Sequence, residues 1–176
     1  MGEQRIKTTL IGLATLLLVL VSPTSNGAPG RVVYRAVVDG PISPAVADFI
    51  KSSIAQAHEA DAALLIIQLD TPGGLPNSTK TIAKDLLASP VPVAVWVAPG
   101  GAGAISAGVF ITLAAHVAVM APGTTIGAAH PVSGQGGDIK GDMREKVENY
   151  AVSFVESIAN RRGRNVEWAE KAVRES

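Results

Sequence analysis

The chain contains the stretch Pro99-Gly-Gly-Ala-Gly-Ala-Ile-Ser-Ala-Gly-Val-Phe-Ile111, which places one serine, Ser106, after a glycine-rich turn and before an apolar run. The preceding segment, Val91-Pro-Val-Ala-Val-Trp-Val97, is typical of a buried strand. Glycine lets one backbone approach another, and a helix start directs free N–H groups at an anion. The order of strand, turn, serine and helix predicts a presented nucleophile. A tight strand-to-helix turn with an incidental serine is the alternative.

A second segment upstream has the same layout. Ala63-Leu-Leu-Ile-Ile-Gln-Leu-Asp70 predicts another buried strand, and it runs directly into Thr71-Pro-Gly-Gly-Leu75. Two glycines after a strand can leave backbone N–H groups uncommitted, as an oxyanion hole requires; a plain turn is the alternative. Two such turns with the same neighbours predict βα units of a parallel sheet, whose loops emerge at one end of the sheet.

The hydrophobic pattern of the remaining chain fits an α/β domain with a mainly parallel sheet flanked by helices. The first helix begins at Ser43-Pro44 and is expected to turn Phe49 toward the core. Strands are also expected over 31–38 and 117–120, and a glycine-rich loop over 131–142. The other expected helices are one capped by Asn77 or Ser78, one from Ser106 to about Ala115, one that Gly163 ends, and a last one capped by Asn165.

Composition excludes several classes of function. The 15 basic and 15 acidic residues balance, and no basic run appears, so nothing points to nucleic acid. The chain has no cysteine, which excludes disulfides and thiol catalysis. The histidines His58, His116 and His130 lack the close helical spacing of a zinc motif. We therefore expect neither a metal nor a cofactor.

The N-terminus has the layout of a secretory signal peptide. Arg5 and Lys7 precede an uncharged run from Thr8 to Val21, which is shorter than the ~20 residues that span a bilayer. Small and turn-forming residues follow, so we expect a signal peptide over residues 1–27 and a domain over 28–176. An uncleaved anchor is the alternative, and in both cases the domain is exported.

Several separated motifs together resemble the Clp-protease/crotonase superfamily, and within it the NfeD family of membrane-bound serine proteases, which are stomatin-operon partners. The motifs are Asp70-Thr-Pro-Gly-Gly74, Ala104-Ile-Ser-Ala-Gly108, Val119-Met-Ala-Pro-Gly-Thr-Thr-Ile-Gly-Ala-Ala-His-Pro131, Ala159-Asn-Arg-Arg-Gly-Arg-Asn165 and Trp168-Ala-Glu-Lys171. The resemblance implies a ClpP-like fold with repeated ββα and βα units. It also implies that the family's protease domain continues beyond the part matched here, so the domain is expected to be shortened at its C-terminal end.

The resemblance implies a serine endopeptidase that cleaves hydrophobic segments of a membrane protein such as a stomatin. The domain would act at a membrane surface as a homodimer or higher homo-oligomer. In this interpretation Ser106 attacks the scissile carbonyl, and backbone N–H groups of Gly73, Gly74 and Ala107 hold the oxyanion. A peptide-binding pseudoprotease or scaffold is the alternative function, and a crotonase-type acyl-CoA enzyme is a weaker one.

Two residues are candidates for the general base. Lys146 matches the family's catalytic lysine, whereas His130 resembles the histidine of the Clp protease triad. A lysine acts as a base only when its pKa falls well below ~10.4, and an apolar pocket made by Val147 and Tyr150 would favour this. By composition alone Lys146 would be solvated and paired with Glu145 or Glu148. The resemblance favours Lys146, and His130 remains the alternative.

Overall fold

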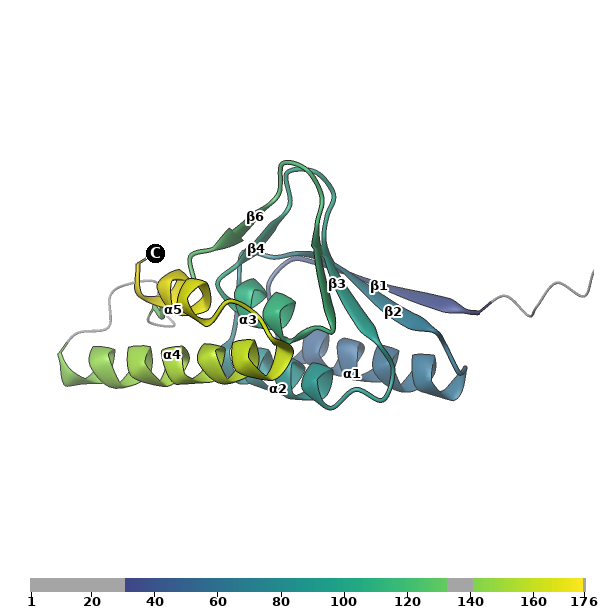
Figure 1. Cartoon of the computed structure of the whole chain (residues 1–176), viewed down its shortest axis with the longest axis horizontal. Coiled ribbons are helices and arrows are strands. Elements are labelled where there is room, and N and C mark those ends of the chain that lie inside the picture. Colours follow the sequence, from purple (N-terminus) through teal and green to yellow (C-terminus); the bar gives the residue numbers. More distant parts are fainter. Residues whose placement is uncertain (1–30, 133–140, 176) are drawn as a thin grey trace, which may run out of the picture. The chain divides into compact units, whose positions relative to one another are not determined.

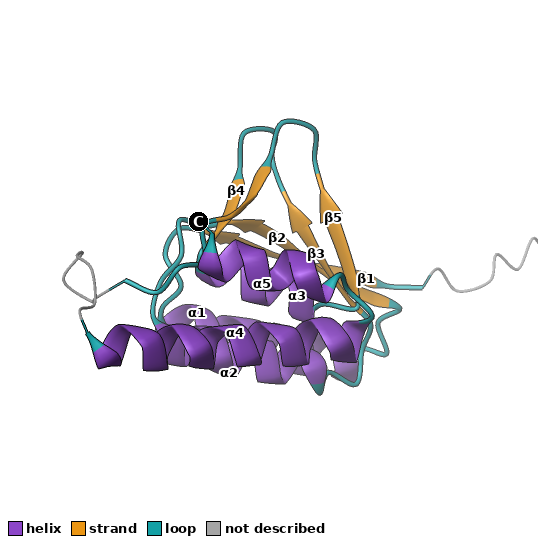
Figure 2. Ribbon diagram, turned by 60° about the vertical axis from the view of Figure 1, so that its left-hand side comes forward, coloured by secondary structure: helices purple, strands orange, loops and turns teal. Residues whose placement is uncertain are grey.

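The computed structural model describes residues 31–132 and 141–175, which lie in the compact unit Arg31–Ser176. A four-stranded parallel sheet has the order β1-β2-β3-β5, and helices lie on one side of it (Figures 1 and 2). The expected α/β fold with a mainly parallel sheet is therefore confirmed. The strands are β1 (Val33–Asp39), β2 (Leu64–Asp70), β3 (Val93–Val97) and β5 (Val117–Met120), and the helices are α1 (Pro44–Glu59), α2 (Pro76–Leu87), α3 (Ala107–Ala114), α4 (Asp142–Arg162) and α5 (Val166–Arg174).

The two faces of the sheet differ in exposure. Alternate residues of β2, namely Leu65, Ile67 and Leu69, are fully buried in the core. On the other face, Val37, Trp96 and Val119 lie in one row of the strand register and are 47%, 36% and 45% exposed. Parallel sheets are usually covered on both faces. Here three large apolar side chains of one row, which also contains Gln68, stay accessible to solvent.

A second, two-stranded parallel sheet pairs β4 (Gly103–Ile105) with β6 (Thr125–Gly127). The sequence pattern predicts a turn over residues 103–105 and no strand at 125–127. Three-residue strands are too short to show a period-2 pattern, which explains why neither was predicted. Because β4 ends at the residue before Ser106, this small sheet fixes where the serine begins α3.

Most helix ends follow the sequence signals. Ser43 Oγ accepts a hydrogen bond from Val46 N at 3.3 Å, Gly163 ends α4 in the left-handed conformation, and Asn165 Oδ1 accepts from Trp168 N at 3.0 Å. Two expectations were wrong. Proline at the first helical position starts α2 with Leu75 as its N-cap, ahead of Asn77 and Ser78. Phe49 is 45% exposed, because α1 turns Ala47, Ile50 and Ile54 toward the core.

The C-terminal end of α4 is tied to two other helices by Arg162. Its Nε donates to the Ala114 carbonyl and its Nη2 to the Leu86 carbonyl, both at 2.8 Å. These carbonyls lie at the ends of α3 and α2, where helices leave acceptors unsatisfied. Burial, followed by the charge of Arg161, lowers the pKa of Arg162. Within the described residues, no helix combines the length and the hydropathy needed to cross a bilayer.

Candidate active site

Ser106 occupies an unusual backbone conformation between β4 and α3, with φ 53° and ψ −108°. A positive φ is rare for a non-glycine residue and persists only where the surroundings impose it. Ser106 N donates to the Gly127 carbonyl at 2.9 Å, and the Ser106 carbonyl accepts from Val109 N at 3.0 Å. The serine is thus held by β6 on one side and by the first turn of α3 on the other.

The two glycine-containing turns expected at one end of the sheet are hydrogen-bonded to each other. Thr71 N donates to the Gly103 carbonyl at 2.7 Å, and Ile105 N donates to the Thr71 carbonyl at 3.0 Å. Gly103 N also donates to Asp70 Oδ1 at 2.9 Å. The side chain of Asp70 therefore joins the turns, and the expectation that both loops meet at one sheet end is confirmed.

Gly73 and Gly74 are packed too closely to accommodate a side chain. A Cβ on Gly73 would lie 2.8 Å from the Ser106 Cβ, and one on Gly74 would lie 2.2 Å from the Ile42 carbonyl oxygen. Both glycines also have positive φ, at 117° and 158°. Gly108 is restricted in the same way, because a Cβ there would lie 2.9 Å from the Thr71 Cγ2. These contacts bring the first turn directly against the serine.

The three candidate oxyanion donors differ in their hydrogen bonding. Gly73 N donates to Thr71 Oγ1 at 3.1 Å, so this N–H already has an acceptor. Within residues 31–132 and 141–175, the N–H groups of Gly74 and Ala107 donate to no backbone or side-chain acceptor. Gly74 and Ala107 both line a cavity together with Ser106. Two uncommitted donors beside one hydroxyl are the arrangement that an oxyanion requires.

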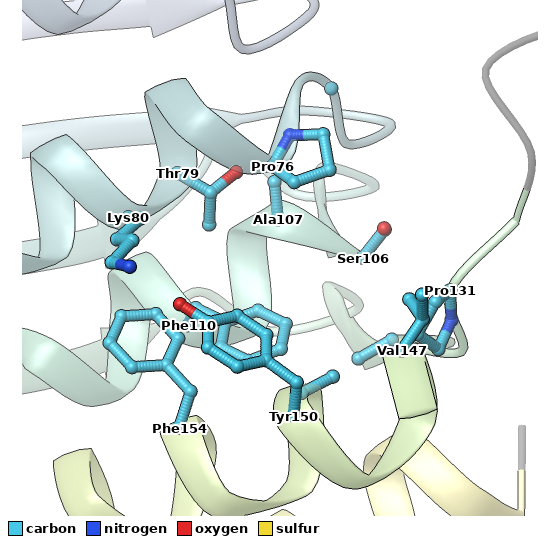
Figure 3. A pocket seen from close by; sticks show the side chains of 13 residues that line it. Pro76, Thr79, Lys80, Ser106, Ala107, Phe110, Pro131, Val147, Tyr150 and Phe154 are labelled. Atoms are coloured by element: carbon cyan, nitrogen blue, oxygen red, sulfur yellow. The ribbon is translucent and has the colours of Figure 1, made fainter. Parts of the chain in front are cut away.

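The cavity beside Ser106 has an aromatic floor (Figure 3). Phe110 and Phe154 stack with ring centroids 5.8 Å apart, and Tyr150 stacks on Phe154 at 6.3 Å. The cavity has a volume of about 120 Å³. Its lining is apolar except at a few positions, and consists of Gly74, Pro76, Thr79, Lys80, Ser106, Ala107, Phe110, Ala129, Pro131, Val147, Tyr150, Ala151 and Phe154.

Lys80 is a lining residue that the sequence analysis did not single out. Its Nζ lies 5.3 Å from the centroid of the Tyr150 ring, a distance typical of a cation–π contact. A signal for it does exist in the sequence. Residues three and four positions after Pro76 share its helix face, and Pro76 directly follows the Gly73-Gly74 turn.

The two candidate bases lie near the cavity, but neither is among its lining residues. Lys146 is exposed near the start of α4, next to Val147, which does line the cavity. Among described residues Lys146 forms no ion pair, and Glu148 pairs with Arg174 at 3.1 Å. His130 is half-buried, and its Nδ1 lies 3.3 Å from the Val173 carbonyl oxygen. The preference for Lys146 over His130 stays a prediction.

Two other expectations concern the loop before α4. Residues 133–140 of the predicted loop lie outside the described residues, as does the predicted signal peptide over 1–27. Asp142 begins α4 and is exposed. In the part of the chain that the structure describes, no group of three or more histidine and carboxylate side chains is placed to hold a metal ion.

Comparison with known proteins identifies related sequences. The family model of the NfeD1b N-terminal domain matches residues 32–176. The membrane-bound protease PH1510 of Pyrococcus horikoshii is 36% identical over 159 residues, which are 89% of this chain. The membrane protein NfeD1b of Bacillus subtilis is 31% identical over 163 residues, or 93% of this chain. In each case the chain spans 36% of the relative's length.

Solved structures share the fold. One is the membrane-bound stomatin-specific protease 1510-N, solved as a lysine-to-alanine mutant in complex with a substrate peptide. Its TM-score with this chain is 0.77 at 36% identity. The match covers 82% of this chain and 67% of that one. A serine-to-alanine mutant of 1510-N gives a TM-score of 0.76. ClpP1 from Listeria monocytogenes, at 21% identity and a TM-score of 0.60, shares the fold, covering 78% of this chain and 77% of its own. The expected ClpP-like fold is confirmed.

Proposed function

Because the chain belongs to the NfeD1b N-terminal domain family, we propose that its domain is a serine endopeptidase with Ser106 as nucleophile and Lys146 as general base. The observation that carries the proposal is the strained backbone at Ser106, next to two uncommitted N–H donors and an apolar cavity. The relatives PH1510 and 1510-N are a membrane-bound protease and a stomatin-specific protease, which supports the same class of activity here.

The mechanism assigns one step to each group. Ser106 Oγ attacks the peptide carbonyl carbon while Lys146 Nζ, as the neutral amine, takes the hydroxyl proton. The carbonyl oxygen becomes an oxyanion that accepts from the N–H groups of Gly74 and Ala107. The C–N bond then breaks, the leaving amine takes the proton from Lys146, and an ester on Ser106 remains. Water hydrolyses this ester by the same route and restores the hydroxyl.

The spacing of the residues mutated in 1510-N supports Lys146 over His130 as the base. The mutants of 1510-N replace a serine and a lysine whose spacing is within one residue of that from Ser106 to Lys146. Lys146 is exposed in the free domain, so the desolvation that favours a neutral amine would come from bound peptide.

The proposed substrate is a hydrophobic segment of a stomatin-like membrane protein. The apolar cavity supports a hydrophobic segment, and the stomatin specificity of 1510-N supports the partner. The membrane-bound relatives support a place at a membrane surface. Residues 1–27 are proposed as the export signal and residues 28–176 as the protease domain, which would act as a homodimer or higher homo-oligomer.

A peptide-binding scaffold without catalysis is the second candidate, and the exposed position of Lys146 outside the cavity lining favours it. Labelling by a fluorophosphonate discriminates between the two. The endopeptidase reacts covalently at Ser106, and Ser106→Ala loses the label. Ser153→Ala, which changes an exposed serine on α4, keeps it. Absence of labelling and of peptide cleavage in the folded wild-type protein would leave the scaffold as the function.

A further inference from the structure

The cavity beside Ser106 has a charged end. Figure 3 shows Ser106 and Lys80 at opposite sides of the cavity, with the rings of Phe110 and Tyr150 between them and that of Phe154 on the Lys80 side. Among the described lining residues Lys80 is the one charged side chain. A peptide side chain that enters from Ser106 therefore passes over aromatic rings and meets an ammonium group.

The ammonium of Lys80 is held in place by a ring and not by a carboxylate. Its Nζ lies 5.3 Å from the Tyr150 centroid, and Tyr150 is itself stacked on Phe154. Among residues 31–132 and 141–175, no carboxylate pairs with Lys80, and the ion pairs present belong to Lys171 and Arg174. The positive charge therefore acts on whatever occupies the cavity.

We propose that Lys80 makes this cavity a charge-selective subsite for one substrate side chain. The subsite accepts a long uncharged side chain, tolerates a carboxylate at its tip, and rejects lysine and arginine. Methylene groups gain from contact with the rings. A second cation beside Lys80 is repelled in a partly desolvated space, where charges interact more strongly than in water. The proposal rests on the proposed endopeptidase function, because a bound peptide supplies the side chain.

The test uses three peptides that differ only at the residue before the cleaved bond, which carries norleucine, glutamate or lysine. Mass spectrometry of the products assigns the cleaved bond. For the wild-type protein we expect kcat/KM to fall in the order norleucine, glutamate, lysine. In Lys80→Glu the order of glutamate and lysine inverts, with a change of at least about tenfold in their ratio. Lys80→Met removes the preference between the two charged peptides and keeps the apolar stem.

A matched control is available one turn further along α2. Lys84→Glu makes the same change of charge on the same helix, but Lys84 is exposed and does not line the cavity. It should leave the order of the peptides as in the wild type. An unchanged order in Lys80→Glu would overturn the proposal. So would an equal loss for all three peptides, since that is the result of a purely structural tie between α2 and α4.

A binding measurement separates this proposal from the catalytic one. Fluorescence anisotropy gives the affinity of the same labelled peptides for Ser106→Ala, alone and combined with Lys80→Glu. If the wild type cleaves nothing and the order of affinities still inverts, the subsite stands and the endopeptidase function fails. If peptides are cleaved and neither cleavage nor affinity inverts, the endopeptidase stands and the charge-selective subsite fails.

Discussion

The serine side and the lysine side of the candidate site are held in different ways. Ser106 is fixed by backbone contacts, with its N–H on the Gly127 carbonyl and Gly73 packed against its Cβ. Lys146 is exposed near the start of α4, where the described tie is the ion pair from Glu148 to Arg174. The comparison teaches that the proposed nucleophile and oxyanion donors are fixed by the backbone of the free domain, whereas the proposed base is on a long, exposed side chain.

Replacing the proposed base is the test of this comparison with the largest expected effect. Lys146→Ala should lower kcat for peptide cleavage on the order of 10³-fold or more, because no group would take the Ser106 proton. His130→Ala should retain most activity. Unchanged circular dichroism is the control for folding. Full activity of Lys146→Ala together with loss of activity in His130→Ala would show that His130 is the general base.

Gly74→Ala tests whether the fixed position of the Gly74 N–H beside Ser106 matters for cleavage. The added Cβ would meet the Ile42 carbonyl oxygen at 2.2 Å, so the turn must shift and carry the Gly74 N–H away from the oxyanion. Loss of one such donor costs about 10²–10³ in kcat, measured in peptide-cleavage assays. Gly101→Ala is the matched control, since Gly101 also has positive φ, 91°, but open space around it. Equal activity of both variants would contradict a role for this N–H.

Arg162→Ala tests the connection between the two sides. Arg162 lies on α4, as Lys146 does, and donates to the last carbonyl of α3, which begins just after Ser106. Removing its two hydrogen bonds takes the charged donor away from the Ala114 and Leu86 carbonyls, and the free energy of unfolding should fall by about 2–3 kcal/mol. Urea denaturation measures this, with the exposed neighbour Arg161→Ala as control. Equal stability of the two variants would show that the tie does not matter.

His116, just beyond α3, gives the smallest expected effect. Burial first, and then the charge of Arg162, lower its pKa, and its Nδ1 accepts a hydrogen bond from Val93 N at 3.2 Å. In the unfolded chain the His116 pKa has its ordinary value of about 6.5, so around and just below that pH the unfolded chain binds more protons than the folded one. The free energy of unfolding therefore falls as the pH drops through that value. His116→Asn should weaken this dependence in urea titrations at pH 7.5 and 5.5. His58→Asn, which changes an exposed histidine on α1, should leave the pH dependence of stability unchanged.

The serine side was also the side that sequence predicted best. Glycine-rich turns after buried strands are strong local signals, and they placed Ser106, Gly74 and Ala107 at one cavity. The strands β4 and β6 were not predicted, because they are too short for a pattern and depend on pairing with each other. The end of the cavity that Lys80 lines depends on contacts between distant segments. Lys80 meets Tyr150 from another helix, and no local pattern encodes that meeting.

The accessible row on the sheet has a practical consequence for spectroscopy. Trp96 stands in this row next to Val119, with Gln68 between it and Val37, and Trp96 is 36% exposed. The emission of an indole depends on the polarity around it, so an apolar surface that covers this face and excludes water moves the Trp96 emission to shorter wavelength. The second tryptophan, Trp168 on α5, contributes a background that Trp168→Phe removes. The protein thus carries its own optical reporter for the uncovered side of its sheet.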